Sequence, residues 1–354
     1  MSLKCCATLF VAACGVLLLM HLRAFADDAP SPRLFAPGVI SGPADDLSPA
    51  FTPDGNTVYF NRSNGTFSVI MVSTLSHGVW STPAVAPFSG KWNDIEPAIS
   101  PDGSFLVFAS NRPKDGRGTA IDGTFNGRNF PGGGGNLWRV NRVGTGWTAP
   151  ERLPDSINTD NATFSSGIVS DGSIYFMKPD SQTGYFRIYR SQYSAGAYLP
   201  PVALSLSDQT MEDVDPAVAP DESFLIFSAN HPGGKNPKRL HIAYRKGQEW
   251  TVPQDLGDSV NEHGGNIEAR LSPDHRTLYF STNTVPPADY PRSEEQIERD
   301  LLQIGTWANG RQNIWSVPLD RWLRQAAAQR LSRNLIPIVL KTAKYTESNL
   351  VESE

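Results

Sequence analysis

Six carboxylates stand at matched places in this sequence, each a few residues ahead of a Pro-Asp turn. Glu96, Asp215 and Glu268 lie five residues before the proline of their turn. The other three lie two residues further upstream in their own copies: Asp46, Asp94 and Asp213. Carboxylates that converge can hold a cation or a basic group of a partner, and one pair can do acid and base work on a glycosidic bond. A catalytic pair is normally unique, so the recurrence favours binding and no catalytic residue is predicted.

One basic residue interrupts this pattern. Arg270 takes a place that small residues hold in the other copies: Ala50, Ala98, Gly167 and Ala217. Its guanidinium can pair with Glu268 or Asp215, or it can orient an anionic ligand. The alternative interpretation of the acids is structural, since turn and strand-capping residues recur wherever a repeat recurs. The residues alone leave both interpretations open.

These residues belong to a repeat that occurs five times. Each copy joins a Pro-Asp-Gly turn, or a variant of it, to an alternating apolar run ending in Phe, and the shared residues are Asp54, Asp102, Asp171, Asp221 and Asp274. Pro presets φ, Asp bonds its own backbone and Gly adopts positive φ, so each copy predicts a hairpin. The spacing suits a four-stranded blade. The prediction is an all-β fold, a single β-propeller of about five blades; a sixth, degenerate blade could lie in residues 111–135.

The outer part of each blade is marked by a third strand and by an aromatic residue three positions ahead of a proline: Trp80, Trp147, Tyr198 and Trp250. Only four such elements follow a repeat. Residues 32–39 match residues 150–157 and 253–260, so the N-terminal segment is predicted to close the last blade beside residues 313–317. Such a latch removes an open sheet edge from the ring.

Two long insertions, residues 111–135 and 283–312, both fall between a second and a third strand. Because strands alternate in direction, the insertions and the acid-bearing starts of the innermost strands emerge on one face. Function concentrates in loops held by a rigid scaffold, so this insertion-bearing face is the predicted working face. Residues 293–302 predict a short capped helix, and residues 320–334 predict a second helix that stops before Pro337.

With these motifs in hand, the chain resembles the WD40-like Pro-Asp repeats of TolB-type bacterial periplasmic propellers. The resemblance covers residues 32–322 and rests on the Pro-Asp-Gly turns, the strands after them and the Trp-x-x-Pro elements. It implies the propeller fold and a binding platform in the envelope. This chain has five copies instead of six and no α/β domain ahead of them, so the partners of TolB are not carried over.

The N-terminus has the layout of a secretory signal peptide. Lys4 precedes an apolar run over residues 9–20, which ends in Ala24-Phe25-Ala26. Cleavage after Ala26 is predicted; a lipoprotein box at residues 11–14 would cut through the apolar run. The run is shorter than the roughly 18 residues that span a bilayer, so no membrane span is predicted after cleavage. The expected organisation is a signal peptide (1–26), a propeller (32–322) and a C-terminal helix and tail (323–354).

Charge and cysteine content narrow the function. The formal net charge is −5, and loss of residues 1–26 removes two bases and no acid. An acidic chain is unsuited to a nucleic-acid partner, since phosphate binding needs a basic surface. All three cysteines lie in the leader, so no cofactor or disulfide is predicted, although a cation at the channel mouth is possible. The predicted function is a periplasmic or secreted module for an envelope protein or small ligand; the alternative is a carbohydrate-active hydrolase or lyase.

Overall fold

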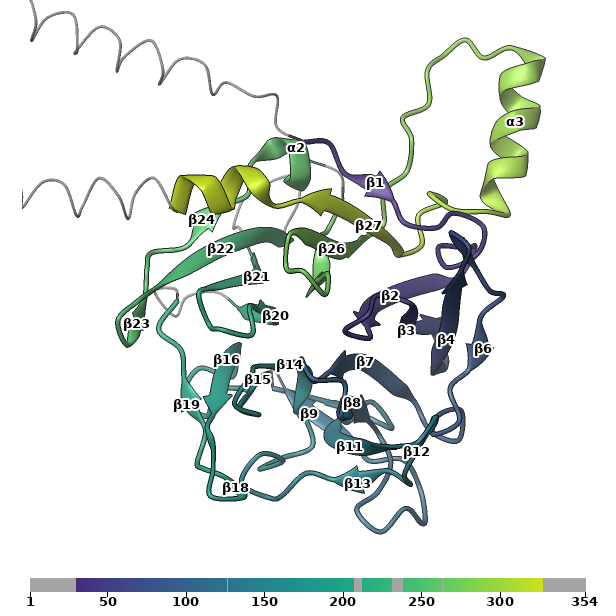
Figure 1. Cartoon of the computed structure of the whole chain (residues 1–354). Coiled ribbons are helices and arrows are strands. Elements are labelled where there is room, and N and C mark those ends of the chain that lie inside the picture. The colour runs from purple at the N-terminus through teal and green to yellow at the C-terminus, as the bar shows by residue number, and fades with distance from the viewer. Residues whose placement is uncertain (1–29, 126, 207–211, 231–237, 263, 327–354) are drawn as a thin grey trace, which may run out of the picture. The chain divides into compact units, whose positions relative to one another are not determined.

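The computed structural model describes residues 30–125, 127–206, 212–230, 238–262 and 264–326, and these form a five-bladed β-propeller (Figure 1). Each blade is an antiparallel sheet whose innermost strand begins one sequence repeat. The predicted fold is confirmed. The sixth blade is not: within residues 111–135 the chain forms only a small hairpin, β9 (Gly123–Phe125) and β10 (Arg128–Phe130).

The first four blades each contain four strands that run from the axis outwards. From the innermost to the outermost strand, the first contains β2 (Asp45–Phe51), β3 (Thr57–Ser63), β4 (Ser68–Ser76) and β6 (Ala84–Val85). The second contains β7 (Asp94–Ile99), β8 (Phe105–Ser110), β11 (Asn136–Val143) and β13 (Glu151–Arg152). The third contains β14 (Phe164–Ile168), β15 (Ile174–Pro179), β16 (Phe186–Ser191) and β19 (Val202–Ala203). The fourth contains β20 (Asp213–Val218), β21 (Phe224–Asn230), β22 (Lys238–Lys246) and β24 (Gln254–Asp255).

The fifth blade is assembled from both ends of the described chain. Its strands are β25 (Ile267–Leu271), β26 (Thr277–Thr282), β27 (Asn313–Pro318) and, at the outer edge, β1 (Arg33–Leu34). Arg33 pairs with Ser316, Leu34 pairs with Trp315, and the Phe35 amide donates to the Ile314 carbonyl at 2.8 Å. The predicted N-terminal latch is confirmed.

The Pro-Asp turns form as their composition predicts. In all five copies the Asp side chain accepts the backbone N–H two residues further on. Gly55 and Gly103 both adopt φ +72° after that Asp, and in the variant turns Glu222 and His275 adopt φ 56° and 58°. An L-residue at that conformation is strained, so the turn geometry is kept even where the glycine is lost.

The aromatic residues that precede a proline do not lie in the outermost strand of their blades but in a short hairpin just before it. Trp80, Trp147 and Trp250 fall in short strands that extend the third strand of their blades as a hairpin: β5 (Val79–Trp80), β12 (Gly146–Trp147) and β23 (Glu249–Trp250). In the third blade the hairpin is β17 (Tyr193–Ser194) with β18 (Ala197–Tyr198). The true outer strand follows the proline, because proline lacks the N–H that a paired position needs.

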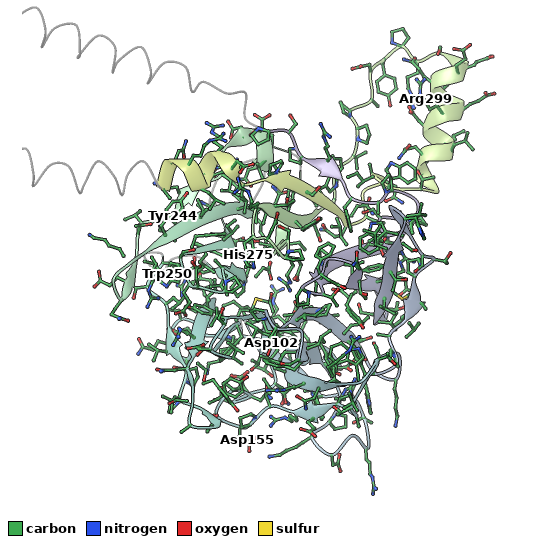
Figure 2. All side chains as sticks on the ribbon, in the orientation of Figure 1. Asp102, Asp155, Tyr244, Trp250, His275 and Arg299 are labelled. Carbon is green, nitrogen blue, oxygen red and sulfur yellow. The ribbon has the colours of Figure 1, made fainter. Side chains whose placement is uncertain are left out.

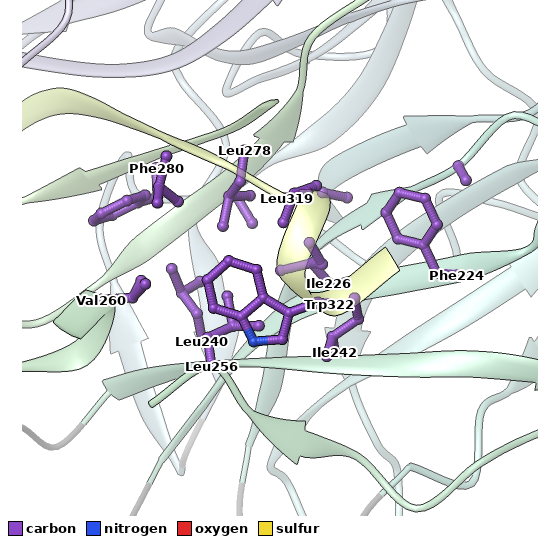
Figure 3. Close-up of a cluster of buried hydrophobic side chains, with 14 of the residues drawn as sticks. Phe224, Ile226, Leu240, Ile242, Leu256, Val260, Leu278, Phe280, Leu319 and Trp322 are labelled. Atoms are coloured by element: carbon purple, nitrogen blue, oxygen red, sulfur yellow. The ribbon is translucent and has the colours of Figure 1, made fainter. Parts of the chain in front are cut away.

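The hydrophobic core consists of clusters between neighbouring blades. Figure 3 shows the cluster between the fourth and fifth blades, where Phe280 of β26 and Ile242 of β22 are buried. Residues 320–326 are helical and add Trp322, which is 4% exposed, while the Tyr244 hydroxyl donates to the Trp322 carbonyl at 2.9 Å. The start of the C-terminal helix therefore packs on the propeller; residues 327–354 lie outside the described residues.

Besides this C-terminal helix, the described residues form α2 (Asp258–Asn261) and α3 (Glu294–Ile304). Helix α3 confirms the capped helix predicted in the insertion 283–312: the Ser293 hydroxyl accepts the Gln296 amide, and the Gln296 side chain accepts the Ser293 amide. In the described part of the chain no helix is long and apolar enough to cross a membrane. The predicted signal peptide lies outside the described residues.

Candidate functional site

Each of the five innermost strands carries a β-bulge at the same place in its repeat. The residue at the bulge has positive φ in every copy: Ser48 53°, Glu96 55°, Ser165 43°, Asp215 57° and Glu268 57°. A left-handed residue turns its side chain and its amide away from the regular alternation of the strand. The residues at the five equivalent positions are all buried, 0% to 7% exposed. They form what we call the axial ring.

Hydrogen bonds within the axial ring join one blade to the next. The Ser165 amide donates to Glu96 Oε2 at 2.6 Å, and the Glu268 amide donates to Asp215 Oδ2 at 3.1 Å. The Ser48 hydroxyl donates to Glu268 Oε2 at 2.7 Å, which connects the first blade to the fifth. Each acid therefore accepts a donor that belongs to another blade. This arrangement supports part of the structural interpretation of the acids, because they hold blades together.

Arg270 reaches across the axis from the fifth blade. Its Nη2 donates to Glu268 Oε2 at 3.1 Å and to Ser165 Oγ at 3.4 Å, and Nη1 donates to the Ala269 carbonyl at 2.7 Å. The side chain is nine-tenths buried. The small residues at the same place in the other four blades leave the space that this single long side chain occupies. Arg270 is thus the counter-ion of the axial ring.

Burial and crowding change the protonation of the ring. Burial raises the pKa of Glu96 well above its usual range, and the nearby charges of Glu268 and Asp215 raise it further, against the opposing effect of Arg270. Burial and Asp215 also raise the pKa of Glu268, while Arg270 and Ser48 lower it. Two carboxylates this close cannot both ionise without cost. Burial and crowding therefore favour the protonated form of Glu96 more than that of an ordinary glutamate.

The three upstream acids are held by arginines. Asp46 Oδ1 lies 2.6 Å from Arg62 Nε, and Asp94 Oδ1 lies 2.6 Å from Arg112 Nη2. Asp213 lies 3.4 Å from an arginine of the preceding blade, Arg187. Burial raises the pKa of Asp46 to about 6, although its hydrogen bond to Arg62 acts in the opposite direction. These ion pairs lie at the start of the innermost strand in the first, second and fourth blades, and the three acids lie apart from the close group formed by Glu96, Asp215 and Glu268.

A central cavity of about 320 Å³ lies next to the axial ring. Its walls come from all five blades and are rich in proline and small residues, and its polar lining includes Ser166, Arg270 and His275. Figure 2 shows His275 toward the middle of the ring of blades. The lining follows each innermost strand from the bulge to the Pro-Asp turn, so the cavity lies on the turn side of the ring. The sequence placed the shared site at the opposite, insertion-bearing face.

Two residues that line this cavity each carry a buried polar atom without a partner in the described structure. The atoms are Arg270 Nε and Ser166 Oγ, and their residues are 6% and 1% exposed. A buried donor without a partner is costly, so each such group requires an explanation. Both atoms are hydrogen-bond donors that belong to residues of the cavity wall. Sequence reasoning named Arg270 but missed Ser166, whose only signal was its place beside Ser165 in the most divergent repeat.

The carboxylates also have the spacing of a cation site. One oxygen each from Glu96, Asp215 and Glu268 lies within 4.8 Å of the other two, and oxygen ligands suit calcium or magnesium. Two of these side chains, however, already accept a backbone amide of the next blade, and Arg270 supplies a positive charge to the third. The three carboxylates are spaced to hold a cation, but the Arg270 guanidinium already supplies positive charge beside them.

Comparison with known proteins supports the fold of this chain. No family model and no curated protein matches the sequence. The α-L-arabinofuranosidase from Lactobacillus brevis is 11% identical over 79% of this chain and 92% of that one, with a TM-score of 0.50. A thermostable family-43 glycoside hydrolase is 12% identical over 80% and 91%, also with a TM-score of 0.50. TolB from Acinetobacter baumannii is 17% identical over 78% of this chain, with a TM-score of 0.40; the chain spans 55% of its length. At these identities the likeness shows that this chain has the β-propeller fold and leaves its activity to be argued from the site.

Proposed function

We propose that this protein is a non-catalytic binding module of the bacterial envelope whose ligand occupies the central cavity. The observation that carries the proposal is that two residues of the cavity wall hold buried donors without a partner in the described structure, Arg270 Nε and Ser166 Oγ. Hydrogen bonds to Glu268, Ser165 and the Ala269 carbonyl hold the Arg270 guanidinium in place. A preorganised donor pair of this kind loses little freedom when a ligand binds.

The lining defines the chemistry of the ligand. A carboxylate or carbonyl oxygen would satisfy both donors at once, because Arg270 Nε–H and the Ser166 hydroxyl can point at one acceptor. The walls, built from prolines and from Ala50, Ala98 and Ala217, favour a slim apolar stem behind that oxygen. In this proposal no metal is required, since the Arg270 guanidinium is the cation of the ring.

Export and repeat class complete the proposal. The apolar run and the Ala24-Phe25-Ala26 site support cleavage by signal peptidase, and the five Pro-Asp turns support the WD40-like class of TolB-type repeats. N-terminal sequencing of the protein from a periplasmic or culture fraction tests the export. We expect a first residue of Asp27; a cytoplasmic protein that retains its leader would contradict this part of the proposal.

The alternative, an enzyme that acts on carbohydrate, fits the site less well. Hydrolysis of a glycosidic bond needs one carboxyl group that reaches the leaving oxygen. The cavity is lined by Arg270 instead of Glu96, Asp215 or Glu268, among the residues that the structure describes. One oxygen of each of these acids already accepts a donor of another blade. Turnover of a polysaccharide, abolished by a single change of one of these acids, would overturn the binding proposal.

The test of binding uses variants of two residues that line the cavity, Ser166→Ala and Arg270→Met. Immobilised protein, wild type or Ser166→Ala, is exposed to envelope extract, and bound molecules are quantified by mass spectrometry. Ser166→Ala removes an unpartnered hydroxyl, so the free energy of unfolding should stay unchanged or rise slightly while capture falls. Arg270→Met should abolish capture, with Arg276→Met, an exposed arginine of the same blade, as the control. Equal capture by wild type, Ser166→Ala and Arg270→Met would exclude the cavity as the binding site.

A further inference from the structure

The insertion 283–312 holds a helix that stands out from the rim of the propeller (Figure 1). Helix α3 spans Glu294–Ile304 and buries none of its residues against the described part of the chain. Eleven residues are too few to be stable alone in water, and helices of this length normally depend on packing. The capping box at Ser293 supports its first turn. Helix α3 is capped but buries none of its residues. It is therefore suited to pack against another molecule.

One face of α3 is apolar and exposed. Ile297, Leu301 and Ile304 follow the i, i+4, i+7 spacing that places side chains on one side of a helix, and they are 41%, 64% and 64% exposed. Val285 and Tyr290, in the strand-like leg before the helix, are 60% and 79% exposed. Scattered exposed apolar residues are ordinary, but a continuous face of them marks an interaction site.

The arm that carries α3 is fixed at its base. Asp45 accepts Arg311 Nη1 at 3.1 Å and the Gln312 amide at 2.9 Å. The Asn309 side chain donates to the Pro43 carbonyl at 3.3 Å and to the Ile304 carbonyl at 3.1 Å. The end of the helix is thereby tied to the segment that joins the latch to the first blade. A fixed base presents the apolar face in a defined direction instead of leaving it on a loose loop.

Charge indicates what kind of surface this face meets. The helix carries four acids and one base. Glu294 and Glu298 flank the apolar face on one side, and Asp300, which pairs with Arg292, flanks it on the other. We propose that α3 docks by its apolar face into an apolar groove of a partner protein whose rim carries Lys and Arg side chains. This is the helix-in-groove mode of recognition, with the acids setting orientation and specificity.

The same charges disfavour two other occupants. Helices that lie on membranes carry Lys and Arg on the polar face, because the lipid surface is negative; α3 carries mainly acids. A second copy of this chain would bring acidic flanks against acidic flanks, which costs free energy at close range. The proposed partner is therefore a different protein, and the interaction is independent of the central cavity.

Site-specific photo-crosslinking in the producing cells tests the proposal. The photoreactive residue p-benzoylphenylalanine replaces either Leu301 or Arg299 in the full chain; two residues apart on a helix, these side chains point in nearly opposite directions (Figure 2 labels Arg299). We expect one protein adduct from position 301, at a yield about tenfold above that from position 299. The crosslinked protein is then purified, and its affinity for the unmodified chain is measured by calorimetry.

Substitutions on α3 distinguish specific docking from nonspecific crosslinking. Leu301→Asp and Glu298→Lys should each weaken binding of the purified partner about tenfold or more, and the wild-type affinity should fall as salt rises. Leu199→Asp, at another exposed apolar residue, should change nothing, and thermal unfolding should be the same for all variants because the face is exposed. Absence of an adduct, equal yields from both positions, crosslinks to a second copy or to lipid, or affinity insensitive to Leu301→Asp would overturn the proposal.

Discussion

At the scale of single residues, the axial ring combines two functions that the sequence could not separate. Glu96 and Glu268 hold neighbouring blades through Ser165 and Ser48, and burial raises the pKa of both beside Arg270. The structural and the binding interpretations are thus complementary, because the same bonds that join the blades also fix the guanidinium that faces the cavity. Replacement of one acid should change the charge of the ring more than its geometry.

Glu96→Gln should remove part of the pH dependence of stability. The raised pKa of Glu96 means that the folded protein binds more protons than the unfolded chain above pH 4.5, so its free energy of unfolding falls as pH rises. Asp46, with a pKa of about 6, contributes in the same direction only at lower pH. As pH rises from 4.5, urea unfolding of wild type should show this fall and Glu96→Gln should show less of it. Glu249→Gln, on the surface, should behave as wild type; a Glu96→Gln slope equal to wild type would contradict the raised pKa of Glu96.

Asp215→Asn should leave the fold intact and weaken the site. The amide oxygen of asparagine can still accept the Glu268 amide, which Asp215 Oδ2 now accepts at 3.1 Å. Loss of the charge relieves repulsion on Glu268 and Glu96, so the melting temperature should stay level or rise slightly, while capture from envelope extract should fall. A large loss of stability with unchanged capture would show that Asp215 acts only as a clasp between blades.

At the scale of elements, the Pro-Asp turns show how a repeat tolerates divergence. Glu222 and His275 replace the glycine and keep its positive φ, but their side chains differ in what they contact. Glu222 accepts Arg190 Nε at 2.6 Å and also bonds the Tyr175 hydroxyl. His275 lines the cavity, where burial lowers its pKa. The first substitution has gained a contact that offsets its backbone strain; the second has gained none of that kind within the described structure.

Restoring glycine at these two turns should therefore have opposite effects. His275→Gly relieves about 1 kcal/mol of left-handed strain and loses part of that to the greater freedom of unfolded glycine, for a net gain of about 0.5 kcal/mol. Glu222→Gly gains the same but loses its bonds to Arg190 and Tyr175, for a net loss of about 1 kcal/mol. Urea unfolding of both variants measures the difference. Equal effects of one sign would show that the side-chain contacts of Glu222 carry no stability.

The elements also show the limit of sequence reasoning for this fold. Blade number, the latch and α3 follow from turn chemistry, internal matching and a capping box, which are local signals. The β-bulge at Glu96 and its equivalents leaves no such signal, because Glu, Asp and Ser are not residues that a left-handed position selects. If the bulge is not known, the alternation of side chains along the strand does not predict which of them meet at the axis. The position of the cavity on the turn side, and the ion pairs of Asp46 and Asp94, depend on contacts between blades that no single repeat contains.

At the scale of the whole molecule, the latch does more than supply an edge strand. Ile40 is fully buried in a cluster with Val58 and Phe60 of the first blade and Ile314 of the fifth. Phe35 packs edge-on against Tyr279 of the fifth blade and Trp80 of the first, with centroids 5.0 Å and 5.8 Å apart. The segment that begins at β1 is thus both the outer strand of one blade and the filling between two.

A chain that begins at Asp45 should therefore lose stability as a whole. It lacks Phe35 and Ile40, and loss of a buried Ile side chain alone costs about 3 kcal/mol; Ile40→Ala provides that comparison. Since the axial ring bonds every described blade to another, calorimetry should show one transition at lower temperature, and hydrogen exchange should accelerate equally at Ile188 in the third blade and Ile314 in the fifth. A chain that begins at Pro32 should match the full mature protein. If only the fifth blade exchanged faster, the blades would be separate cooperative units; if the shortened chain kept its melting temperature, the latch would contribute pairing without stability.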